Sequence, residues 1–156
     1  MAAKKMAIIA TKGALDMAYP PLILASTAAA LGWEVQVFFT FYGLQLLRKD
    51  LSGIEISPVG NPAMPMPMPM PVIVSVLPGM QAMATSMMKA KMKKKGVASL
   101  EELRALCIEA EVKLIACQMT VDLFEFSKDD FIAGIEYGGA ATFLKFAGET
   151  DVCLFI

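Results

Sequence analysis

The sequence predicts a three-layer α/β/α domain built on a mainly parallel sheet of five strands. Short apolar runs alternate along the chain with segments of helical periodicity, which is typical of strand–helix–strand units. The chain has 156 residues, of which 56% are apolar, and this is enough to bury a core of its own. We therefore expect residues 1–156 to form one domain that needs neither disulfides nor a structural metal.

An apolar run and a proline pair define the start of the predicted domain. Met6–Ala10 predicts a first buried strand, and the helical segment after it extends to about Leu31, where a glycine follows. Pro20 and Pro21 lack backbone donors, and their rings clash with the preceding turn of a helix. We therefore expect the main part of this helix to begin near Pro20, or to be kinked there.

A second strand and a proline-rich loop follow. Residues 35–40 alternate in the manner of a strand that enters a buried edge, and a short helix ending near Lys49 comes next. Residues 54–59 are compatible with a weak strand. Residues 61–71 include four Met-Pro pairs, whose alternating prolines favour an extended path without ladder hydrogen bonds. We expect this Met-Pro loop to be a surface loop or a lid.

Two helices are predicted between the Met-Pro loop and the third strand. The first begins after Pro78-Gly79, and its expected core-facing stripe consists of Met80, Met83, Ala84 and Met87. The second begins at Ser99, because a glutamate at position 102 completes a capping box. Its predicted apolar stripe consists of Leu100, Leu103, Cys107 and Ala110.

The last third of the chain continues the alternation. Leu114–Cys117 predicts a third clear strand, Ser127 is expected to cap the next turn, and Gly138-Gly139 introduces a further helix. Val152–Ile156 closes the chain as a last buried strand. Strands that alternate with helices in this way predict a parallel, flavodoxin-like sheet with right-handed crossovers.

Charge is distributed unevenly, although the net charge is only −1. Five lysines lie between Lys89 and Lys95, and removing their charges from the net value of −1 leaves −6. Nucleic-acid binding needs a broad basic face, so we do not expect it here. The lysine cluster is expected to be a solvated helix end, and contact with anionic lipid or an acidic partner is the alternative.

The cysteines and the apolar segments bear on the cellular compartment. Three cysteines without a CxxC motif or a framework spacing favour a reducing, cytoplasmic setting. No secretory signal is expected, because the apolar run between Lys5 and Lys12 is too short. Residues 16–48 are apolar enough to resemble a membrane span, but Gly32-Trp33-Glu34 divides them into a helix and a strand. We therefore expect a soluble protein without a transmembrane segment.

Cys117 is the candidate reactive residue. It ends a predicted buried strand, and the ligands of parallel α/β sheets collect outside the carboxyl ends of the strands. Because the chain contains no histidine, the thiol would have to be activated by backbone amides or by a lysine or arginine. Lys12, in the turn after the first strand, lies at the same predicted edge. Position alone also allows a buried structural cysteine.

The other thiols and the methionines are weaker candidates. Cys107 and Cys153 are both predicted to pack in the core, and Cys107 is the only candidate for a secondary thiol. Nine of the 13 methionines lie between Met64 and Met92, and thioethers suit Cu(I). Prolines separate the loop methionines, however, and no cysteine or histidine lies among them. We therefore predict no bound metal or other cofactor.

Five short motifs occur in a characteristic order along nearly the whole chain. They are Gly13-Ala14-Leu15-Asp16, Phe38-Phe39-Thr40-Phe41-Tyr42-Gly43-Leu44, Pro78-Gly79-Met80, Ala116-Cys117-Gln118-Met119-Thr120-Val121-Asp122 and Gly138-Gly139-Ala140-Ala141. Together they resemble the DsrE/DsrF-like superfamily, and most closely its DsrE2-type branch, whose members are also labelled peroxiredoxin-like. The chain departs from this pattern at Pro20-Pro21 and in its regular Met-Pro loop.

The resemblance implies a three-layer α/β fold, a homo-oligomer and a role in cytoplasmic sulfur trafficking as a sulfurtransferase component. In this interpretation Cys117 accepts sulfane sulfur as a persulfide. It then passes the sulfur to a partner such as a TusA-like carrier or a rhodanese. Apart from the resemblance, we expect the Met-Pro loop to cover the thiol and limit its overoxidation. Six further residues are the expected contacts of the substrate: Lys12, Gly13, Tyr42, Gly43, Gln118 and Met119.

Two other functions remain open. The first is a non-catalytic binding or assembly module that uses its methionine-rich surface for a partner or for Cu(I). The second is a thiol peroxidase, for which Cys107 would have to turn toward Cys117 as the resolving cysteine. Sulfur adducts on Cys117 after exposure to polysulfide would separate the carrier from the binding module.

Overall fold

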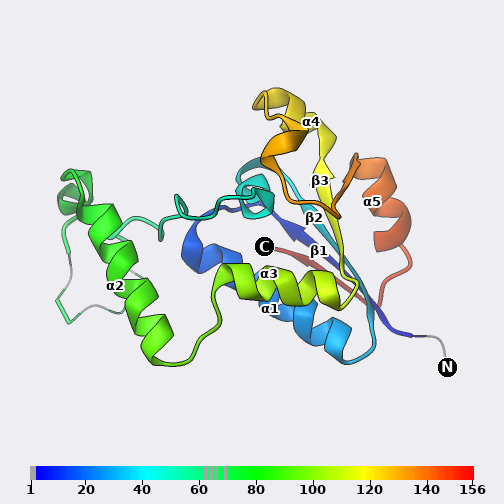
Figure 1. Ribbon diagram of the computed structural model, residues 1–156, viewed down its shortest axis with the longest axis horizontal. Coiled ribbons are helices and arrows are strands. Elements are labelled where there is room, and N and C mark those ends of the chain that lie inside the picture. Colours follow the sequence, from blue (N-terminus) through cyan, green and yellow to red (C-terminus); the bar gives the residue numbers. More distant parts are fainter. Residues whose placement is uncertain (1–2, 62, 64, 66, 69) are drawn as a thin grey trace.

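The computed structural model describes residues 3–61, 63, 65, 67–68 and 70–156, and it has the predicted α/β architecture (Figure 1). All strand pairs in its sheet are parallel, and the spatial order is β4-β3-β2-β1-β5. The strands are β1 (Lys5–Ala10), β2 (Glu34–Phe39), β3 (Lys113–Cys117), β4 (Glu136–Gly138) and β5 (Val152–Phe155). The predicted fold class, with a five-stranded parallel sheet, is therefore confirmed.

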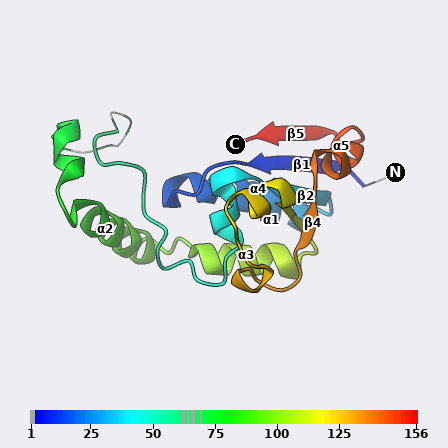
Figure 2. The same ribbon diagram turned by 90° about the horizontal axis from the view of Figure 1, so that it is seen from above.

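Helices cover both faces of the sheet. Helices α1 (Leu15–Ala30) and α3 (Leu100–Glu109) lie side by side and cover one face, where they enclose the larger core cluster. The short helix α5 (Ala140–Ala147) packs on the other face over a separate, smaller core (Figure 2). Successive residues of a strand point to opposite faces, so each strand contributes to both cores.

The fifth strand is not the one that the sequence predicted. Residues 54–59 form no strand, and the fifth strand is β4 at the sheet edge beside β3. The backbone of this segment is bonded to helices instead, because the Leu15 amide donates to the Glu55 carbonyl at 2.7 Å and the Ile56 amide donates to the Thr85 hydroxyl at 3.0 Å. With these polar groups satisfied, the segment packs its apolar side chains into the core without joining the sheet.

Helix α1 begins at Leu15 and contains both prolines, so the expectation of a start near Pro20 was wrong, while the alternative of a kink there stays a prediction. Tertiary contacts hold the turn that precedes the prolines. The Asp16 carboxylate accepts hydrogen bonds from the Ser57 amide at 2.7 Å and from the Ser57 hydroxyl at 2.8 Å. These bonds, together with burial of Pro21, offset the backbone bonds that the two prolines cannot make.

Helix α2 (Met80–Lys94) and the 3₁₀ helix η2 (Val72–Val76) extend away from the sheet, as both views show (Figures 1 and 2). The predicted stripe was wrong at Met83 and Met87, which are exposed, whereas Ala84 packs against the core as predicted. Instead, the face that packs against the body includes Ala84, Thr85, Met88 and Met92. Burial of Thr85, whose hydroxyl accepts the bond from Ile56, fixes this rotation of the helix.

The remaining elements follow the sequence more closely. The capping box of α3 is present, and the stripe is buried except for Ala110, which lies beyond the end of the helix. The segment after β2 is a 3₁₀ helix, η1 (Phe41–Leu47), and Ser127 caps the short η3 (Lys128–Asp130). No helix within the described residues is both long enough and apolar enough to cross a membrane. The lid role predicted for the Met-Pro loop depends partly on residues 62, 64, 66 and 69, which lie outside the described residues.

Candidate thiol site

Cys117 lies where the sequence placed it, as the last residue of β3 and the N-cap of helix α4 (Gln118–Leu123). Only 5% of its surface is exposed. It belongs to the smaller core, on the face of the sheet that α5 covers, together with Phe38 and Phe143. The thiol is thus at the carboxyl edge of the sheet but is largely shielded from water.

Two threonines surround the Cys117 thiol. Thr120 lies three residues further along α4 and is fully buried, whereas Thr40 follows directly after β2, the neighbouring strand. Their hydroxyl oxygens are 3.2 Å apart, and the Phe41 amide donates to the Thr120 hydroxyl at 3.3 Å. The ends of β2 and β3 are therefore joined by a small polar network beside the sulfur.

This network changes the pKa of the Cys117 thiol. Burial acts to raise the pKa, because it disfavours the thiolate. Hydrogen bonds from the Thr120 and Thr40 hydroxyls, and from the amides of Thr120 and Met119, act in the opposite direction. They outweigh burial, so the net pKa of Cys117 is lowered. The site can therefore hold an anionic sulfur without a cationic side chain in contact with it.

The role of these hydroxyl groups was not predicted from the sequence, which indicated only backbone amides, lysine or arginine as groups that could activate the thiol. The signal was present in the spacing, since Thr120 lies three residues after the cysteine, within the first turn of the following helix. Thr40 follows Phe39, which pairs with Ala116, the residue before Cys117. A search for hydroxyl residues at these two positions would have found both.

Gly13 and Gly43 hold the turns at this edge together. A Cβ atom on Gly43 would overlap the backbone carbonyl of Ala10, and one on Gly13 would overlap the backbone carbonyl of Tyr42. The turn after β1 and the start of η1 are thus packed backbone to backbone. The structure gives both predicted site glycines a packing role.

Lys12 and Tyr42 lie together, but apart from the thiol. They line a cavity of about 350 Å³ with Gly13, and Cys117 is not among its lining residues. Tyr42 is mostly exposed and stacks on Phe124, with ring centroids 6.1 Å apart. This cavity lies at the end of β1, while the thiol lies at the end of β3, with β2 between them.

The two residues that follow the thiol have different roles. The side-chain amide of Gln118 donates to Asp122 at 2.7 Å, which directs it along α4. Met119 contributes its backbone amide to the sulfur, and its side chain is exposed. Of the six predicted substrate contacts, only Met119 is therefore among the groups that shift the pKa of the thiol.

All three cysteines lie within the described residues and are free thiols. Cys107 is fully buried in the larger core, so the sheet separates it from Cys117. Burial raises the pKa of Cys107 to about 11. The structure therefore does not bring the predicted secondary thiol to Cys117.

Cys153 is exposed, so the prediction that it packs in the core was wrong. It lies on β5, which is an edge strand whose alternate residues are exposed. Strand β5 is three strand spacings, or about 14 Å, from β3, so this thiol is also remote from Cys117. The described residues contain no group of three or more histidine, cysteine, aspartate or glutamate side chains that could hold a metal.

Comparisons with known proteins agree with this architecture. The chain is 69% identical over 160 residues to the sulfur carrier protein DsrE2 of Allochromatium vinosum, with full coverage of both chains. It is 34% identical over 161 residues to the uncharacterized protein YrkE of Bacillus subtilis, covering 98% of this chain and 97% of that one. The crystal structure of the Escherichia coli ychN protein has the same fold, with a TM-score of 0.55 at 12% identity, covering 98% of this chain and 99% of the other. Since the model of the DsrE/DsrF/DrsH-like family also matches residues 2–155, the chain belongs to that family.

Proposed function

We propose that this protein is a sulfur carrier that holds sulfane sulfur as a persulfide on Cys117. The observation that supports this most directly is the hydroxyl and amide network, which lowers the pKa of a thiol that burial alone would raise. The terminal sulfur of a persulfide is also an anion, and the same donors can stabilise it. The relative from Allochromatium vinosum, named a sulfur carrier protein, supports the same role.

The proposed transfer is a displacement at sulfur and needs no external oxidant. The Cys117 thiolate attacks the terminal sulfur of a donor persulfide, R–S–SH, and a new S–S bond forms to Cys117. The S–S bond of the donor breaks, and the donor leaves as the thiolate R–S⁻. The transferred sulfur keeps its proton in Cys117–S–SH, which can then ionise. The reverse of this step delivers the sulfur to an acceptor thiol.

We further propose that donor and acceptor are proteins, and that the chain acts as a homo-oligomer in the cytoplasm. A TusA-like carrier or a rhodanese is the partner expected from the family resemblance. Exposed apolar side chains lie on the elements around the thiol and could contact such a partner: Phe41, Tyr42, Met119 and Leu123. Lys12 is exposed beside the Tyr42 cavity, where its long side chain can meet an anionic partner at the same edge.

Incubation with polysulfide followed by mass spectrometry of the intact chain and its peptides tests this proposal. We expect mass increments of whole sulfur atoms on the peptide that contains Cys117, and their loss in Cys117→Ser. Cys107→Ser and Cys153→Ser are matched controls that should keep the adduct. Absence of sulfur on Cys117 with every sulfane donor tried, in folded protein, would overturn the carrier function.

A further inference from the structure

The chain separates its charges between two regions. Residues 56–100 contain five lysines and no acidic residue, whereas the rest of the chain has a net charge of −6. All five lysines lie on or directly after α2, which extends away from the sheet (Figure 1). We call residues 72–95, which include η2 and α2, the arm, and the remaining described residues the body.

The arm exposes apolar side chains as well as lysines. Ile73 and Val76 in η2 are 76% and 77% exposed, and Thr85 is the only buried residue of α2. The exposed apolar side chains of the arm are Val72, Ile73, Val76, Leu77, Met83 and Met87. A contiguous segment of this kind is typical of an interaction surface rather than of a solvated helix end.

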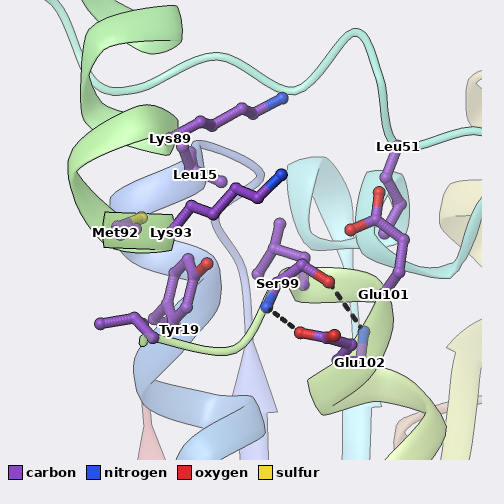
Figure 3. Close-up of a pocket in the computed structure, with 11 residues that line it drawn as sticks. Leu15, Tyr19, Leu51, Lys89, Met92, Lys93, Ser99, Glu101 and Glu102 are labelled. Carbon is purple, nitrogen blue, oxygen red and sulfur yellow. Dashed lines mark hydrogen bonds between the residues drawn. The ribbon is translucent and has the colours of Figure 1, made fainter. Parts of the chain in front are cut away.

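The lysines of the arm divide into two groups. Lys89 and Lys93 line a cavity of about 400 Å³ between α2 and the start of α3, where Glu101 and Glu102 lie on the opposite wall (Figure 3). Lys91, Lys94 and Lys95 do not line this cavity and are exposed. Within the described part of the chain, none of the five forms an ion pair. Their charge is therefore available to another molecule.

We propose that the arm docks on the acidic body of a second copy of this chain. This inference rests on the self-association proposed above and names its surface. The charges of arm and body are opposite and nearly equal in number, so docking neutralises both. An anionic lipid surface would attract the arm but repel the body. A reciprocal arrangement about a two-fold axis would bury the apolar side chains of both arms in one closed assembly.

The acceptor surface follows from the distribution of acidic residues on the body. Residues 122–130 hold four acidic residues and one lysine, and they begin within α4. Asp122 and Asp130 are engaged by Gln118 and by the Ser127 amide, respectively. Glu125 and Asp129 are exposed, and we assign them as the carboxylates that meet the arm.

Charge reversal on the arm tests the proposal. In Lys91→Glu/Lys94→Glu/Lys95→Glu we expect the dissociation constant of the assembly to rise at least roughly tenfold. The control Lys4→Glu/Lys49→Glu/Lys145→Glu changes the net charge equally, but on the body, and should retain the assembly. Sedimentation equilibrium of each variant, at low and high sodium chloride, gives the dissociation constants. We also expect high salt to weaken the wild-type assembly, because exposed charges are screened.

Two further comparisons separate the apolar and acidic contributions. Ile73→Ser/Val76→Ser should weaken assembly, whereas Leu106→Ser/Ile108→Ser, which changes exposed apolar residues of α3, should not. Glu125→Lys/Asp129→Lys should dissociate alone and re-form a complex when mixed with the arm-reversed variant. Circular dichroism spectra and urea midpoints of all variants verify that each one is folded.

The outcomes distinguish this inference from the proposed carrier function. An assembly that persists when the arm is reversed or its apolar residues are replaced would overturn the docking proposal, while sulfur loading of Cys117 would be unaffected. A wild-type chain that remains monomeric would also overturn it, as would a chain that binds anionic phosphatidylglycerol vesicles through the arm without self-association. Restored assembly in the mixture of reversed variants would support it.

Discussion

At the scale of single residues, the reactivity of Cys117 is set by its neighbours rather than by its burial. The thiol is almost fully shielded, which alone would make it a weak acid. Thr120 and Thr40 reverse this effect because each hydroxyl can donate to the sulfur in a site from which water is largely excluded. Cys107 of the same chain provides the contrast, because burial raises its pKa to about 11.

Replacing Thr120 tests this account. Thr120→Val keeps the shape of the side chain but removes the donor, so we expect the pKa of Cys117 to rise. Thr120→Ser should largely retain the low pKa, and Thr150→Val, away from the site, should not change it. The pH dependence of iodoacetamide alkylation of Cys117 measures the pKa. An unchanged midpoint in Thr120→Val would contradict the role of the hydroxyl.

The lowered pKa also predicts a pH dependence of stability. The folded state binds the Cys117 proton more weakly than the unfolded state does, so the free energy of unfolding rises with pH between the folded pKa and about 8.5. Below the folded pKa this contribution is absent. Urea unfolding of the wild type and Cys117→Ser, followed over a pH series that runs from below the folded pKa to above roughly 8.5, measures it. The difference between the two proteins should shift in favour of the wild type at the higher pH.

At the scale of elements, two turns pack against each other at the sheet edge that carries the site. Each turn has a glycine at the point of contact. Gly43 approaches the carbonyl of Ala10, and Gly13 approaches that of Tyr42. This close packing positions Tyr42 and Lys12 around one cavity, and it positions Thr40, which precedes η1, beside Cys117. The glycines therefore act on the site through the backbone.

Alanine at position 43 is expected to separate these turns. We predict that Gly43→Ala lowers the free energy of unfolding by about 1–3 kcal/mol, because its methyl group collides with backbone that cannot rotate away. Gly53→Ala is the matched control, since a Cβ atom there would meet no other atom within 4 Å and the φ of Gly53 is not positive. Urea unfolding measures both. Equal stability of the two variants would refute the close packing.

At the scale of the whole molecule, the two faces of the sheet are covered unequally. Helices α1 and α3 bury a large core on one face, while the smaller core on the other face depends on α5 and contains Cys117. Phe143 of α5 stacks on Phe38 of β2, with ring centroids 5.1 Å apart. One short helix therefore stabilises that face and also shields the thiol.

Truncation of this helix contact should affect stability and reactivity together. Phe143 is 2% exposed, and Phe143→Ala is expected to cost about 3–5 kcal/mol and to speed alkylation of Cys117. Leu144→Ala, at the next position of α5 but 62% exposed, should change neither by much. Urea unfolding and alkylation rates at fixed pH check this. A destabilised Phe143→Ala protein with unchanged alkylation would show that α5 does not shield the thiol.

The alternation of apolar runs with helical segments determined the fold class, and the position of Cys117 at the end of a strand followed from it. Local signals of this kind are reliable because they depend on neighbouring residues alone, as in the capping box at Ser99. The start of α1, the absence of a strand at 54–59 and the rotation of α2 were decided by tertiary hydrogen bonds, through Asp16 and Thr85. The activation of the thiol was decided in the same way, because Thr40 and Thr120 lie 80 positions apart and meet only when β2 and β3 pair. Sequence order determined which strand carries the thiol, and only the packing of the sheet determined what surrounds it.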